Sequence, residues 1–81
     1  MRERLNIYSV DSLYGDHIGY VVASSWGNAC SMVNPTENIT VTDIDECCVS
    51  KKVLKQIIDE ELDEDEETLK KLKRRYGIYG N

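Results

Sequence analysis

The sequence predicts an α+β fold in which a three-stranded sheet of β-β-α-β order packs against helices. Two observations predict this fold class. Residues 1–49 contain short runs rich in β-branched and aromatic residues around one stretch with helical spacing, whereas residues 50–77 keep helical spacing throughout. A chain of 81 residues has room for one hydrophobic core, so we expect residues 1–81 to form a single domain.

Three segments have the composition and alternation of β-strands. Leu5–Val10 and Ile18–Ala23 are separated by Asp11–His17, which contains turn-forming serine, glycine and aspartate, so these two strands should form an antiparallel hairpin. The second strand is apolar on both faces, which predicts that it is central in the sheet. Glu37–Ile44 alternates in the same way and should be the third strand.

A short helix is expected between the second and third strands. Apolar residues recur at helical spacing from Trp26 to Val33, and Ser24 or Ser25 can cap the first turn. Pro35 cannot continue a helix, so the helix should end before it.

The carboxy-terminal segment is helical and highly charged, and its pattern leaves two arrangements open. Ser50 is a favourable N-cap, and Gly77 is suited to the residue that follows a helix. Because no glycine or proline lies between Ser50 and Gly77, one long charged helix can form. A helical hairpin forms instead if Asp63 or Asp65 caps a second helix.

The apolar faces of these elements define the expected core. Its members are Leu5, Ile7, Tyr20, Val22, Trp26, Ala29, Cys30, Val33, Ile39, Val41, Val53, Leu54, Ile57 and Ile58. Both Trp26 and Val53 are included because each belongs to the apolar stripe of its helix.

Charge is the most distinctive property of the sequence. The formal net charge is −5, and eight of the nine positions from 59 to 67 are acidic. These acids are Asp59, Glu60, Glu61, Asp63, Glu64, Asp65, Glu66 and Glu67. A basic block, Lys70–Arg75, follows them. An acidic protein without a separate basic face is a poor candidate for direct nucleic-acid binding.

The acidic run has one structural and two functional interpretations. It can be a solvated helix face that Lys70 and Lys71 neutralise through i,i+4 pairs with Glu66 and Glu67. It can meet the basic block of a second chain in an antiparallel homodimer. The apolar seam of that homodimer would comprise Leu62, Leu69, Leu72 and Tyr76. Finally, it can imitate nucleic-acid phosphates and occupy a basic groove on another protein.

Few residues could carry chemistry. Cys30, Cys47, Cys48 and His17 lack the paired spacing of zinc ligands, so we expect no metal and no cofactor. His17 stands beside Asp16, but a nucleophilic site needs further groups that converge on the histidine, and an exposed position in the hairpin is favoured. No phosphate-binding, dinucleotide-binding or nucleophile-elbow motif occurs. We therefore do not expect an enzyme.

The sequence also predicts a cytoplasmic protein. No apolar run approaches the ~20 residues that a membrane span needs. Met1–Leu5 contains two basic residues, but no apolar stretch follows, as it would in a signal peptide. We therefore expect no membrane association and a reducing environment for the cysteines.

The first half of the chain contains a recurrent order of segments. A strand of the type Leu5–Val10 is followed by a strand such as Gly19–Ala23, which runs directly into a helix, and then by a strand such as Ile39–Ile44. This order resembles that of short proteins encoded by bacteriophages and mobile elements. The chain departs from it at Trp26–Cys30, which replaces a charged, helix-favouring stretch, and the resemblance does not extend to Lys51–Asn81. It implies a viral or mobile-element origin and a location in the host cytoplasm.

Together, these features predict a small acidic protein-binding module without catalytic activity. Its resemblance to phage proteins, a group that includes anti-CRISPR inhibitors, implies an inhibitor that binds a host defence protein and blocks it. The acidic run at residues 59–67 would then imitate nucleic acid toward a host protein that handles nucleic acid. The alternative is a self-associating structural or regulatory protein that forms a homodimer through its carboxy-terminal helix.

Overall fold

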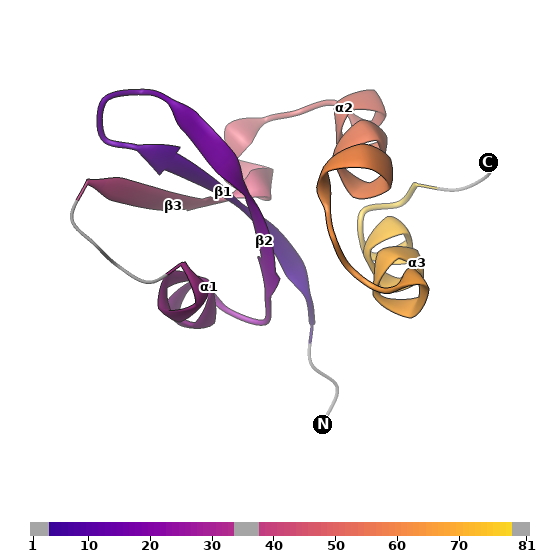
Figure 1. The fold of residues 1–81 in the computed structure, drawn as a ribbon. Coiled ribbons are helices and arrows are strands. Elements are labelled where there is room, and N and C mark those ends of the chain that lie inside the picture. Colours follow the sequence, from indigo (N-terminus) through magenta and orange to yellow (C-terminus); the bar gives the residue numbers. More distant parts are fainter. Residues whose placement is uncertain (1–3, 34–37, 79–81) are drawn as a thin grey trace.

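The computed structural model describes residues 4–33 and 38–78 and has an α+β fold (Figure 1). The strands are β1 (Asn6–Ser12), β2 (His17–Ala23) and β3 (Ile39–Asp43). The α-helices are α1 (Trp26–Met32), α2 (Lys51–Gln56) and α3 (Glu66–Arg75), with a 3₁₀ turn η1 (Ile44–Cys47) and a π-helical turn η2 (Ile57–Glu61). The predicted β-β-α-β order followed by helices is confirmed. The predicted helix stop at Pro35 and the start of the third strand at Glu37 lie outside the described residues.

The central strand of the sheet is β1, and not β2 as the sequence predicted. The strand order is β2-β1-β3, and both neighbours run antiparallel to β1. Strand β2 is an edge strand that is nevertheless apolar on both faces, because helices pack on both faces of the sheet. Apolar residues on both faces of a strand therefore indicate that both faces of the sheet are covered. They do not indicate whether the strand is central or at an edge.

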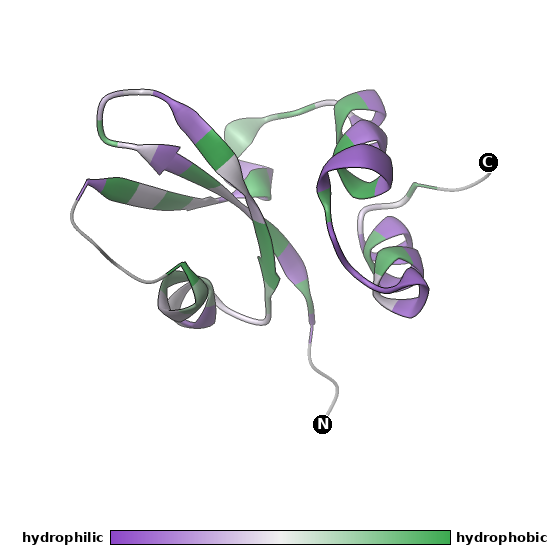
Figure 2. Ribbon diagram, in the orientation of Figure 1, coloured by the Kyte–Doolittle hydropathy of each residue, from purple (hydrophilic) through white to green (hydrophobic). Residues whose placement is uncertain are grey.

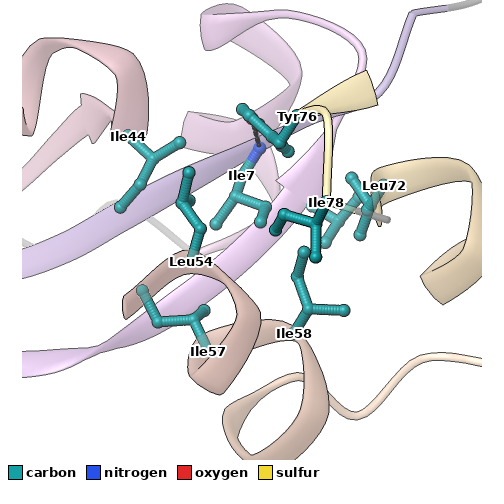
Figure 3. Close-up of a cluster of buried hydrophobic side chains, with 9 residues drawn as sticks. Ile7, Ile44, Leu54, Ile57, Ile58, Leu72, Tyr76 and Ile78 are labelled. Atoms are coloured by element: carbon teal, nitrogen blue, oxygen red, sulfur yellow. Dashed lines mark hydrogen bonds between the residues drawn. The ribbon is translucent and has the colours of Figure 1, made fainter. Parts of the chain in front are cut away.

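Successive residues of β1 contribute to two cores, one on each face of the sheet, whereas the sequence predicted only one. Ile7 packs with Val22 in the core that α2 and α3 cover, whereas Tyr8 packs with Ala23 and with Ala29 of α1. Hydrophobic positions accordingly occur in the strands and in every helix (Figure 2). The buried residues of the larger core are Ile7, Val22, Ile44, Leu54, Ile57, Ile58, Leu72, Tyr76 and Ile78 (Figure 3).

The expected core is correct at its centre and wrong at two positions. Six of its members are buried: Ile7, Val22, Ala29, Leu54, Ile57 and Ile58. Trp26 is 59% exposed, because it occupies the first position of a seven-residue helix and lies beside β3, where its Nε1 donates to the Val41 carbonyl at 2.8 Å. Val53 is 41% exposed, because the buried side of α2 is formed by Leu54 and continues into Ile57.

The carboxy-terminal segment forms two helices joined by an extended connection. The side chain of Ser50 caps α2 by accepting from the Val53 N–H, as its position predicted. Leu62 has extended backbone angles, and the carboxylate of Asp65 then caps α3 by accepting from the Thr68 N–H at 2.8 Å. The helical hairpin with Asp65 as its second cap is thus the correct one of the two arrangements.

Helix α3 ends in a Schellman motif that returns the chain to the core. Gly77 has a φ of +70°, which glycine adopts without a steric penalty. Its N–H donates to the Arg74 carbonyl at 3.3 Å, and the Ile78 N–H donates to the Lys73 carbonyl at 2.8 Å. Ile78 consequently folds back into the larger core.

One side-chain hydrogen bond joins α3 to the central strand. The pairing of β1 with β3 stops at Tyr8 and Asp43, where the chain leaves the sheet in η1. Beyond this point the N–H of Ile7 donates to the Tyr76 hydroxyl at 2.8 Å (Figure 3). Burial raises the pKa of Tyr76 to about 12, so the hydroxyl stays neutral at physiological pH.

Replacing Tyr76 with Phe leaves the buried Ile7 N–H without an acceptor while it keeps the aromatic ring. We expect this change to lower the free energy of unfolding by about 1–3 kcal/mol, measured by urea denaturation at pH 7. Tyr14→Phe is the matched control, because the Tyr14 ring is 81% exposed, and it should change stability by less than about 0.5 kcal/mol. Equal stability of Tyr76→Phe and the wild type would contradict the role of this bond.

The same hydroxyl predicts loss of stability at alkaline pH. The pKa of Tyr76 is about 12 in the folded chain, above its ordinary value of 10.0. Its contribution is therefore complete below pH 10 and is lost as the pH rises toward 12. In urea denaturation between these pH values, the stability of the wild type should fall more steeply than that of Tyr76→Phe. Parallel pH profiles would argue against a buried neutral hydroxyl.

Candidate protein-binding surface

The acidic run spans the end of η2, the connection that follows it and the start of α3 (Figure 1). Residues 59–61 belong to η2, residues 63–65 to the connection, and residues 66–67 to the first turn of α3. All eight acidic residues are exposed. The carboxylates are therefore spread over three elements instead of one helix face.

Two of these acids have internal partners. The Asp59 carboxylate bonds Lys55 at 2.7 Å and Lys73 at 2.8 Å, so it joins η2 to α2 and to α3. The hydrogen bond from Lys55, followed by that from Lys73, lowers the pKa of Asp59. The capping hydrogen bonds from Thr68 lower the pKa of Asp65 in the same way. Both residues fix the path of the acidic connection.

The other six acids form no salt bridge within residues 4–33 and 38–78. They are Glu60, Glu61, Asp63, Glu64, Glu66 and Glu67, and we call them the acidic surface. The predicted pairs of Glu66 with Lys70 and of Glu67 with Lys71 do not form, so the interpretation as a neutralised helix face is wrong. Both glutamates occupy the first turn of α3, where the helix dipole already favours negative charge.

Part of the basic block is used inside the chain. Lys73 pairs with Asp59, and Arg75 pairs with Asp45 of η1 at 3.3 Å. The Arg75 guanidinium also lies 5.0 Å from the centre of the Tyr76 ring, within the range of a cation–π contact. These contacts hold α3 against η1 and η2, so the block is not a uniform cationic face.

The apolar seam predicted for a homodimer lies within a single chain. Leu72 is fully buried and Tyr76 nearly so, and both belong to the larger core (Figure 3). Leu62 and Leu69 are half-buried against the same core. These four residues therefore form no exposed stripe, because they pack against the sheet of their own chain.

His17 has a carboxylate partner that the sequence did not predict. The irregular register of the β1–β2 pair places Asp11 opposite His17, and Asp11 Oδ1 lies 2.9 Å from His17 Nδ1. Asp16, the neighbour in sequence, is not the partner. Ser9 Oγ donates to the second carboxylate oxygen of Asp11 at 3.1 Å. The serine thus bonds the carboxylate and does not bond the imidazole, unlike a nucleophile that histidine activates.

The three cysteines do not converge with other ligands. Cys30 is half-buried in α1, whereas Cys47 and Cys48 are exposed near the end of η1. Burial and then the nearby carboxylates, Asp11 first, raise the pKa of Cys47, which keeps this thiol protonated at neutral pH. Within the part of the chain that the structure describes, no group of three or more potential metal ligands occurs.

A shallow groove of about 230 Å³ lies between β2 and the α2–η2 segment. It is lined by Tyr20, Val53, Gln56, Ile57, Glu60 and Glu61. Two of these residues, Glu60 and Glu61, also belong to the acidic surface. Burial raises the pKa of Tyr20, and the negative charges of Glu61 and Asp11 raise it further. No sequence pattern indicates this groove, because at least 33 positions along the chain separate Tyr20 on one wall from the residues of the other wall.

Comparison of the chain with protein-family models, curated proteins and solved structures finds no match. Among the described residues, no helix has the length and hydrophobicity that a membrane crossing requires.

Asp59→Asn tests whether the paired carboxylate stabilises the hairpin. The pKa of Asp59 is lowered below its ordinary value of 3.8, so its contribution is present above that pH and is lost as the pH falls through the lowered pKa. We expect the variant to be less stable than the wild type at pH 7 in urea denaturation and equally stable in strong acid. Asp63→Asn removes a carboxylate without a partner and should cause no loss at pH 7. A loss of the same size in both variants would contradict this role of the two lysines.

Proposed function

We propose that this protein is a non-catalytic binding module whose acidic surface occupies the basic, nucleic-acid-binding face of another protein. The observation that carries the proposal is the set of six exposed carboxylates without a salt-bridge partner in the described part of the chain. Proteins bind nucleic acids largely through lysine and arginine contacts to phosphates, which do not depend on base sequence. Carboxylates at a suitable spacing can engage the same cationic side chains.

The way in which the acidic surface is held supports this proposal. Asp59 is fixed by Lys55 and Lys73, and Asp65 is fixed as the cap of α3. Leu62, in the middle of the acidic run, packs against the larger core. A binding partner therefore need not order this segment, whereas it would have to order a flexible acidic tail at a cost in conformational entropy.

The resemblance of the first half of the chain to phage proteins supports a more specific form of the proposal. In this form the chain is a phage-encoded inhibitor, similar in role to anti-CRISPR proteins, and its partner is a host defence protein that handles nucleic acid. The contacts of His17 fit a non-catalytic role. The Ser9 hydroxyl donates to the Asp11 carboxylate that bonds His17 Nδ1, and it does not bond the imidazole as an activated nucleophile would.

The paired variant Asp63→Asn/Glu64→Gln tests this function, because it removes two charges from the acidic surface and breaks no internal bond. Bacterial proteins eluted from heparin are passed over the immobilised chain and released with duplex DNA at constant salt. We expect DNA to release the captured proteins, and the variant to bind them about three- to tenfold more weakly.

The control for this experiment is Asp16→Asn/Glu46→Gln, which removes two exposed charges elsewhere on the molecule. It should bind as the wild type does. Equal binding by both variants and the wild type, or captured proteins that DNA does not release, would refute imitation of nucleic acid.

A further inference from the structure

The outer edge of β2 carries backbone groups without a partner in the sheet. The Ile7 N–H points to Tyr76, away from β2, so Ile7 and Val22 form a non-hydrogen-bonded pair of the antiparallel ladder. The N–H and carbonyl groups of Val22, and those of Tyr20 two residues earlier, therefore point outward. No hydrogen bond recorded for residues 4–33 and 38–78 occupies them.

This edge lacks most of the features that keep edge strands from pairing. Residues 19–23 include no charged residue and no proline, whereas edge strands of monomeric proteins are commonly blocked by lysine, proline or a bulge. The register irregularity of the β1–β2 pair falls at Ile18 and affects only the hairpin end of the strand. Within residues 4–33 and 38–78, the regular part of β2 thus has no strand paired to its outer edge, although Val22 itself is only 7% exposed.

The groove between β2 and α2 lies beside this edge. Tyr20 of β2 and Ile57 line it, and Val53 of α2, which is 41% exposed, adds an apolar contact. A strand added to β2 directs every second side chain toward the face on which the groove lies. Glu60 and Glu61 line the same groove, so its charge favours a basic side chain there.

We propose that β2 accepts an extended segment of a partner protein, in which basic and apolar side chains alternate, as a fourth strand of the sheet. Backbone pairing with Tyr20 and Val22 supplies affinity, and the groove selects the side chains. The inference rests on the proposed function only for the positive charge of the partner. A second copy of this chain is a poorer occupant, because β2 contains no lysine or arginine and each chain has a net charge of −5.

The test uses a fluorescent nine-residue peptide of alternating lysine and valine and two derivatives of it. One derivative is N-methylated at the lysine amides and the other at the valine amides, so each loses the donors of one edge. Only one edge of the peptide can face β2. We expect fluorescence anisotropy to show that one derivative binds at least about tenfold more weakly than the parent, whereas the other binds within about threefold of it. Equal affinity of all three peptides would overturn strand addition.

A pair of surface variants locates the binding site. Val53→Lys places a positive charge in the groove and should weaken peptide binding about tenfold. Met32→Lys makes the same kind of change on α1, where Met32 is 57% exposed, and should leave binding unchanged. The peptide should also slow hydrogen exchange of the Tyr20 and Val22 amides. Unchanged exchange, or equal binding by both variants, would overturn the proposal.

The variants also distinguish this inference from the proposed function. Asp63→Asn/Glu64→Gln changes no residue that lines the groove, so it should bind the peptide as the wild type does even if it no longer captures heparin-binding proteins. Conversely, Val53→Lys could lose the peptide while DNA-sensitive capture persists, which would separate the two activities. Sedimentation of the free protein as a dimer that Val53→Lys dissociates would identify a second copy as the occupant and overturn the choice of partner.

Discussion

The docking of α3 on the central strand is the interaction on which the rest of the structure depends. The hydroxyl of Tyr76 accepts a hydrogen bond from the Ile7 N–H at the point where β3 has already left the sheet. The side chains of Leu72 and Ile78 pack in the same core. A buried N–H without an acceptor would weaken β1, which is the central strand of the sheet that the described residues form. Helix α2 and η2 share this core through Leu54, Ile57 and Ile58.

The two proposed binding surfaces follow from this docking. Asp59 bridges Lys55 and Lys73, so the helical hairpin closes around its acidic connection and holds it in place. The packing of Ile57 against the sheet brings α2 beside β2 and so creates the groove. A surface for cationic side chains and an edge for an extended backbone therefore adjoin each other at Glu60 and Glu61.

The apolar stripe of the carboxy-terminal helices shows how a sequence pattern can be correct and its interpretation incomplete. The spacing of Leu62, Leu69 and Leu72 correctly indicates a buried helix face. It does not indicate what buries that face. The same apolar residues can pack against a partner chain or against the sheet of their own chain. The helix is interrupted at Leu62, where the backbone becomes extended, and this break lets the apolar stripe face the sheet.

The sequence alone determined the features that depend on neighbouring residues: the β-β-α-β order followed by helices, the cap at Ser50, the helix end at Gly77, and the acidic run. It left open whether Asp63 or Asp65 caps a second helix, and the structure selects Asp65. Each is governed by local backbone geometry and by side chains within a few positions. The tertiary structure decided the features that join distant segments. These are the central place of β1, the acceptor role of Tyr76, the Asp11–His17 pair, the exposure of Trp26 and Val53, and the groove beside β2. No short-range pattern encodes them, because hydrogen bonding and burial at these positions depend on which elements the completed core brings together.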